Sequence, residues 1–228
     1  MKNKKTLIPI LITAVFILIT GILYKQPFLQ ILPLFVSLFV MTLQANINPV
    51  GYLLGACNSI LYCFVFLYFG LYASLFNALF ISFPMQLFTF FHWKKRTVEN
   101  MVVMRELSWP FRIIVALITV IACIVAIVTL SKTNSQFVLL DSISNVLGIL
   151  IPILTMLAYV EYAYLWPIHS LLALFLNIQV MTTDITYITY VIYGIFSLYC
   201  VIRGTYNVLI PFHKQKQAEK KRMEKPGL

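Results

Sequence analysis

Long apolar runs separated by short polar segments fill most of this chain. Eight runs are candidate membrane-spanning helices: Leu7–Leu23, Phe28–Leu43, Val50–Phe69, Leu71–Phe91, Phe111–Leu130, Phe137–Ala158, Trp166–Val180 and Tyr187–Ile210. A helix needs about 20 residues to cross a bilayer, with a range of about 17 to 25. The second and seventh runs are therefore short, and we expect their ends to extend into the flanking segments. Only the region of Gly70 separates the third run from the fourth, and a single helix there would leave seven spans.

The distribution of basic residues decides between seven and eight spans. Of the 17 Lys and Arg residues, 14 lie in four places: the first five residues, Lys94–Arg96, Arg105 with Arg112, and the tail after Pro211. Loops that are rich in Lys and Arg stay in the cytoplasm. Eight spans put all four clusters and both termini on that side, whereas seven would expose one cluster outside. The pattern therefore predicts an all-α, multi-pass membrane protein with eight helices and cytoplasmic termini.

The first run also has some features of a signal peptide, since it follows Lys2, Lys4 and Lys5. No small-x-small cleavage site follows it, and it is long for the apolar region of a signal peptide. We interpret it as an uncleaved first span.

Composition excludes several classes of function. The chain is 61% hydrophobic and 11% charged, against about 25% charged residues in soluble domains. A net charge of +10 would indicate nucleic acid as the partner of a soluble protein. Here the basic residues flank apolar runs, so the expected partner is a bilayer with an anionic inner leaflet and not nucleic acid. No Cys/His cluster has metal-ligand spacing, and no nucleophile–base pair or Gly-rich phosphate loop is present. We therefore predict neither an enzyme nor a bound metal or cofactor.

The spans divide the chain into five parts. We expect a basic amino terminus with a first helix (1–27), a three-helix bundle (28–93), a basic cytoplasmic loop with a linker helix (94–136), a second three-helix bundle (137–210) and a disordered basic tail (211–228). Three spans, one span and three spans give both bundles the same orientation, as a parallel repeat requires. Tyr52-Leu53 and Asn58 stand 112 residues before Tyr164-Leu165 and Ser170, which is thin support for a repeat.

Polar side chains within the spans are the candidates for function, because polar groups at membrane depth are costly and usually face a cavity or another helix. Asn58 and Tyr62 lie four residues apart and share a helix face, as do Tyr162 and Trp166 if that segment is helical. Aromatic rings beside amides suit a flat heterocycle that carries a polar group. In the alternative interpretation, the aromatic residues are interfacial anchors and the amides only tie helices together.

Acidic residues are placed near the helix ends. Asp141 is about one turn inside the outer end of the sixth run, and Glu161 is at the inner end. Proton-coupled carriers usually bury a carboxylate or a His near the midplane. Only His169 is a candidate here, and packing is its preferred role. We therefore expect no strong ion coupling.

Three stretches together resemble the Pnu family of bacterial vitamin transporters, which includes the PnuC-like nicotinamide riboside carriers. The first runs from Gly55 to Tyr62 and continues with Leu71-Tyr72-Ala73-Ser74. The second is Gln86 followed by Trp93. The third runs from Asp141-Ser142 to Tyr159-Val160-Glu161 and Trp166.

The resemblance implies a SWEET-like core of three, one and three helices behind an extra amino-terminal helix, in a bacterial plasma membrane. It further implies a homotrimer, one central site per protomer, and facilitated diffusion of a small-molecule substrate that is phosphorylated inside the cell for NAD biosynthesis. The substrate-binding residues it implies are Asn58, Tyr62, Gln86, Asp141, Glu161, Tyr162, Trp166 and Ser170.

The chain departs from the family pattern at the ligand-binding motif. The first tryptophan position of the motif is Ala163, its asparagine position is Ser170, and Gln86 replaces an asparagine. Nicotinamide riboside is the leading substrate. The carriers of thiamine, riboflavin and deoxynucleosides are sister groups of similar architecture. Two functions of other classes remain: a binding subunit that needs a separate energising complex, and a structural membrane protein.

Overall fold

The computed structural model describes residues 4–68, 72–98, 101–132 and 138–223, and this part of the chain is almost entirely helical. Seven of its helices are long and apolar enough to cross a membrane, and the apolar stretch Leu7–Leu23 adds a shorter one. The prediction of eight runs agrees with this result. The uninterrupted helices are α1 (Lys4–Leu23), α2 (Phe28–Ala45), α3 (Val50–Tyr68), α6 (Trp109–Leu130), α7 (Val138–Met156), α8 (Tyr162–Thr183) and α9 (Ile188–Met223).

The fourth span changes its helical form along its length. It comprises α4 (Tyr72–Asn77), a π-helical turn η1 (Ala78–Ser82) and α5 (Phe83–Arg96). Pro84 lies at the start of α5 and has no N–H to donate to the preceding turn, and the wider π turn ends just before it. The loop after this span was predicted to begin at Lys94. That boundary is wrong, because Lys94–Arg96 form the last turn of α5.

A small hairpin and an extended segment connect α5 to α6. Strands β1 (Thr97–Val98) and β2 (Met101–Val102) pair in antiparallel fashion. The chain then runs against the turn between α7 and α8: the Arg105 N–H donates to the Ala158 carbonyl, and the Val160 N–H donates to the Arg105 carbonyl, both at 2.8 Å. Ala158 has a φ of 57°, in the left-handed region, which reverses the chain between the two helices.

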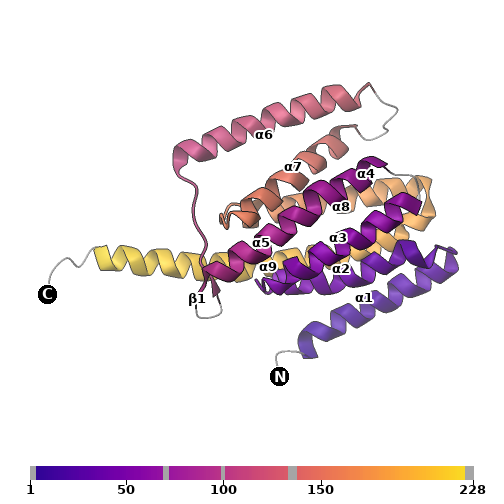
Figure 1. Ribbon diagram of the computed structural model, residues 1–228, viewed down its shortest axis with the longest axis horizontal. Coiled ribbons are helices and arrows are strands. Elements are labelled where there is room, and N and C mark those ends of the chain that lie inside the picture. The colour runs from indigo at the N-terminus through magenta and orange to yellow at the C-terminus, as the bar shows by residue number, and fades with distance from the viewer. Residues whose placement is uncertain (1–3, 69–71, 99–100, 133–137, 224–228) are drawn as a thin grey trace.

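The spans on either side of the linker form a closed ring. In the first triplet (α2, α3 and the α4–η1–α5 span), α2 packs on α3 and α3 on α5. In the second triplet (α7, α8 and α9), α7 packs on α8 and α8 on α9. Contacts of α5 with α7 and of α2 with α9 join the triplets. Corresponding helices of the two triplets run in the same direction in Figure 1, as the predicted parallel repeat requires.

Two helices stand outside the ring. α1 packs against α2 and α9, where Ile17, Leu34 and Val201 are buried in a shared core. α6 packs against α7 at the edge of the molecule (Figure 1). In α6, which is described throughout, no residue is buried. The apolar side chains of α6 that point away from α7 therefore face lipid or another molecule in the membrane.

Helix ends differ from the predicted runs in two ways. α2 and α8 are longer than their apolar runs, as expected, and α8 begins at Tyr162. The prediction of a disordered tail is wrong for residues 211–223, because α9 continues through Pro211 to Met223. Lys, Gln, Ala and Glu are good helix formers, and no Gly or Pro follows before Pro226. At about 1.5 Å per residue, α9 is about 54 Å long, well beyond the bilayer core of about 30 Å.

Candidate functional site

A cavity of about 520 Å³ lies inside the ring, within the range of about 300–1,000 Å³ that is typical of small-molecule sites. Helices of both triplets line it. The aromatic lining residues are Tyr52, Tyr62, Tyr162, Trp166 and Tyr193, and the polar ones include Ser37, Gln44, Asn58, Ser59, Asn77, Gln86, Thr89, Asn145, Thr155 and His169. The cavity thus joins the two halves of the fold.

One wall of the cavity is a chain of aromatic rings. Ring centroids are 4.8 Å apart between Tyr52 and Trp93, 6.1 Å between Trp93 and Tyr162, and 6.0 Å between Tyr162 and Trp166. Trp93 is fully buried behind this wall, and its Nε1–H donates to the Thr155 carbonyl at 2.7 Å. Because α8 begins at Tyr162, Tyr162 and Trp166 are one helical turn apart and share a face. This packing fixes the ring of Trp166 at the cavity surface.

A group of polar lining residues comes from the first triplet. The Asn58 Nδ2 donates to Ser37 Oγ at 2.8 Å, and the Gln86 Nε2 donates to Ser59 Oγ at 3.2 Å. Asn58 Oδ1 and Gln86 Oε1 are buried and have no hydrogen-bond partner within the described residues. A buried acceptor without a partner is unfavourable by about 1–3 kcal/mol, so both oxygens are available to a ligand that carries N–H or O–H groups.

Gly55 allows Gln86 to reach this position. A Cβ atom at residue 55 would lie 1.7 Å from Gln86 Oε1 and 2.7 Å from its Cδ. Only glycine leaves space for the amide against α3. The sequence Gly55-x-x-Asn58 therefore places two amides at one wall of the cavity.

Charged side chains do not line the cavity within the described part of the chain. Its titratable lining group besides the tyrosines is His169, whose imidazole hydrogen-bonds the backbone of Ser144. The described residues also contain no group of three His, Cys, Asp or Glu side chains that could hold a metal ion. The site can bind a ligand through stacking and hydrogen bonds.

Comparison with known proteins identifies the family. The sequence model of the nicotinamide mononucleotide transporter family matches residues 27–204. The chain belongs to this family. A crystal structure described as the vitamin B3 transporter PnuC has a similar fold, with a TM-score of 0.73, 19% sequence identity and 93% of each chain covered. A comparison with curated protein sequences gives no match.

Membership of this transporter family makes the chain a membrane-embedded protein with several spans, and it confirms the resemblance to PnuC-like carriers. The similarity to the PnuC structure confirms the predicted fold class. At this level of identity, the structural likeness concerns the fold.

The structure brings together five of the eight predicted site residues of this family member. Asn58, Tyr62, Gln86, Tyr162 and Trp166 all line the cavity. They come from helices of both triplets, so residues more than 100 positions apart in the sequence face one space.

The other three predicted residues do not line the cavity. The Asp141 carboxylate accepts a hydrogen bond at 2.8 Å from Asn145 Nδ2, and Asn145 is a lining residue. Ser170 is buried next to the lining residue His169. Ala163, at the motif position where the family has a tryptophan, is fully buried and also lies outside the lining.

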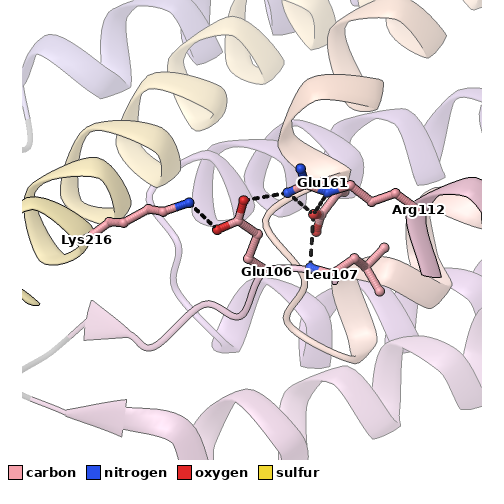
Figure 2. Close-up of polar contacts among 5 residues, drawn as sticks. All are labelled: Glu106, Leu107, Arg112, Glu161 and Lys216. Atoms are coloured by element: carbon pink, nitrogen blue, oxygen red, sulfur yellow. Dashed lines mark hydrogen bonds and ion pairs between the residues drawn. The ribbon is translucent and has the colours of Figure 1, made fainter. Parts of the chain in front are cut away.

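Glu161 is part of an ion-pair network at the start of α8 (Figure 2). Its Oε1 accepts from the Leu107 N–H at 3.0 Å and from Arg112 Nη2 at 2.8 Å. Arg112 also pairs with Glu106 at 2.6 Å, and Lys216 of α9 pairs with the other oxygen of Glu106 at 2.6 Å. Hydrogen bonds from Lys216 and Arg112 hold the pKa of Glu106 below its ordinary value of 4.5. The network connects the segment that leads into α6 to the start of α8 and to the C-terminal part of α9.

Several lining residues were not among the predicted site residues. Tyr52 and Thr155 belong to the wall around Trp93, and Tyr193 comes from the last span. Tyr52 has a detectable sequence signal, since it lies on α3 three residues before Gly55 of the Gly55-x-x-Asn58 motif, on the same helix face. Tyr193 has none, because one tyrosine in an aromatic-rich helix is indistinguishable from an interfacial anchor.

Proposed function

We propose that this chain takes up nicotinamide riboside through a bacterial plasma membrane by facilitated diffusion, and that phosphorylation inside the cell retains the substrate. The observation that carries the proposal is the composition of the cavity wall. It combines the rings of Tyr162 and Trp166 with two unpartnered amide oxygens, at Asn58 and Gln86, and lacks charged side chains in the described residues.

Nicotinamide riboside matches this wall group by group. Its flat pyridinium ring is permanently cationic, and the face of a tryptophan attracts such a cation. Its carboxamide and sugar hydroxyls are hydrogen-bond donors, which the oxygens of Asn58 and Gln86 require. Stacking and two oriented hydrogen bonds would together fix the ring and the sugar.

The same wall disfavours the phosphorylated form of the substrate. A phosphate group carries up to two negative charges, and burying an unpaired charge is strongly unfavourable. No Lys or Arg lines the described cavity to pair with it. We therefore assign the riboside and not the mononucleotide to the site. Thiamine, riboflavin and deoxynucleosides are the alternative substrates.

The proposed mechanism has no ion coupling. Coupled carriers usually place a carboxylate at the midplane, and Asp141 and Glu161 stand near the ends of their helices. Movement through the cavity then only equalises concentrations, so accumulation depends on the kinase. The basic hairpin end of the bundle, where α1 begins and α9 ends (Figure 1), is the proposed cytoplasmic side. We assign a homotrimer, in which exposed apolar surface such as that of α6 meets other subunits.

A thermal-shift panel tests the proposed substrate. Purified protein is heated with nicotinamide riboside, nicotinamide mononucleotide, thiamine, riboflavin or deoxynucleosides. A ligand at about 100 times its Kd stabilises the folded state by about 2.7 kcal/mol. We expect this shift for the riboside and little for the mononucleotide. An equal shift with the mononucleotide, or a larger one with another vitamin, would refute the assignment. Uptake by liposomes containing only this chain distinguishes a transporter from a binding subunit.

A further inference from the structure

A second recess lies on the outside of the bundle, where α5 meets α7. It is an open groove of about 440 Å³, lined by Phe88, Phe91, His92 and Lys95 of α5 and by Met156 and Leu157 at the end of α7. Phe88 is 63% exposed and Phe91 is 52% exposed. Because α5 ends at Arg96 and α7 ends at Met156, the groove lies at the basic end of the bundle. It also crosses the contact between α5 and α7, which is one of the two seams where the triplets meet.

Cationic side chains gather at the inner edge of this groove. Lys95 lines it, and Arg105 Nη2 donates to the carbonyl of the lining residue Leu157 at 2.9 Å. Arg96, Arg105 and Lys95 all act electrostatically on the imidazole of His92. Within the described residues, the ion pairs involve only Arg112 and Lys216 as cations. The positive charge at the groove is therefore not neutralised by carboxylates of the described chain.

His92 lines the groove and carries a polar atom beneath its surface. Its Nε2 atom is buried and has no hydrogen-bond partner among the residues that the structure describes. A neutral imidazole can donate from this nitrogen to a phosphate oxygen. The groove thus combines the unpartnered nitrogen of His92, the cation of Lys95 and an apolar surface.

We propose that this groove binds an anionic phospholipid of the cytoplasmic leaflet. One acyl chain lies along Phe88, Phe91 and Met156, and the headgroup phosphate lies between Lys95 and His92. Basic pockets between membrane helices on the cytoplasmic side bind anionic headgroups. Free phosphate would satisfy the cations but leave the apolar part of the groove unfilled. The bound lipid would contact both α5 and α7 and so stabilise the seam between the triplets.

Lipid binding by two neighbouring lysine variants tests the proposal. Full-length protein in neutral detergent is titrated with phosphatidylglycerol, with phosphatidylcholine of the same acyl chains, and with glycerol phosphate. We expect phosphatidylglycerol to bind more tightly than phosphatidylcholine, and Lys95→Gln to weaken it about fivefold, which corresponds to about 1 kcal/mol for one lysine. Lys94→Gln is the matched control, because Lys94 lies 5.8 Å from the ring centroid of Phe90 and does not line the groove.

A bulky substitution tests the acyl-chain position. Met156→Trp fills the groove without changing charge, so it should weaken phosphatidylglycerol binding, whereas Ile153→Trp, one turn earlier on α7 and exposed, should not. If Met156→Trp does not fold, the lysine pair decides alone.

Four results would overturn the inference. Equal losses for Lys94→Gln and Lys95→Gln would mean general surface attraction, and equal binding of phosphatidylcholine would remove the role of charge. Binding of glycerol phosphate as tight as that of phosphatidylglycerol would mean that the groove binds a soluble anion and not a lipid. A changed oligomeric mass of lipid-free Met156→Trp, with lipid binding intact, would identify the groove as a contact between subunits.

Discussion

Substituting Gly55 with alanine should weaken substrate binding without unfolding the protein. The new Cβ would lie 1.7 Å from Gln86 Oε1 and 3.2 Å from its Nε2. The amide is the end of a flexible side chain, so it moves away and the backbone stays in place. The variant therefore moves the Gln86 amide away from the cavity wall, although residue 86 remains a glutamine.

The magnitude follows from the bonds that are lost. Displacement breaks the 3.2 Å hydrogen bond from Gln86 Nε2 to Ser59 Oγ, which contributes about 0.5–1.5 kcal/mol. Alanine in a helix interior recovers about 0.5–1 kcal/mol relative to glycine. We therefore expect a net change in stability of at most about 1 kcal/mol. Losing the contact from Gln86 Oε1 to the ligand should raise the Kd by about 2- to 12-fold.

Isothermal titration of purified protein with nicotinamide riboside measures this effect, with Gly148→Ala as the control. Gly148 also lines the cavity, but its added Cβ would lie 3.4 Å from His169 Nε2, an ordinary contact. Both variants add one methyl group to a helix at the cavity wall. The difference between them isolates the displacement of Gln86 from the loss of volume.

A double-mutant cycle tests the assumed cause. If Gly55→Ala acts through Gln86, it should add almost nothing to the Kd of Gln86→Ala. Additive effects of the two substitutions would refute the reasoning. So would wild-type affinity in Gly55→Ala.

Four further predictions follow from the site, the network and the topology. Trp166→Ala should raise the Kd about tenfold or more, since stacking on a base contributes about 1–3 kcal/mol, and Trp166→Phe should recover much of the binding. Wild-type affinity in Trp166→Ala would make this ring an interfacial anchor. Collapse of proton and sodium gradients should leave initial uptake into proteoliposomes unchanged, and a strong loss would show coupling. The lowered pKa of Glu106 stabilises the fold above its ordinary pKa, and this contribution disappears as pH falls through the lower folded value. Glu106→Gln should therefore show a smaller drop in melting temperature than wild type between about pH 6 and about pH 3. In intact cells, a cysteine at position 132 should react with an impermeant reagent and one at position 95 should not; labelling at 95 would reverse the orientation.

The sequence predicted the spans and much of the cavity wall because both depend on local patterns. Asn58 and Tyr62 share a helix face by their spacing alone, as do Tyr162 and Trp166, and each pair lines the cavity. The charge clusters predicted which connecting segments lie at the same end of the bundle. Helix packing then brings the Asn58/Tyr62 face and the Tyr162/Trp166 face to one cavity.

The position of Glu161 could not be predicted in the same way. Its partners Leu107 and Arg112 are about 50 residues away in the sequence, and no local spacing indicates such a pair. The helical tail was missed for a different reason. It has no apolar face, and its helix propensity is evident only when residues 212–223 are considered as a continuation of α9.

The lone helix α6 also has a consequence for how such a chain could arise. A three-helix unit crosses the membrane an odd number of times, so a second copy fused directly to it would insert upside down. One extra crossing restores the direction, and α6 provides it while burying none of its own residues. Its sequence is then constrained mainly by length and hydropathy, and its packing within the protomer is limited to the face toward α7. Two genes that each encoded one triplet could therefore build the same ring without any α6, because α5 meets α7 and α2 meets α9 through side-chain packing.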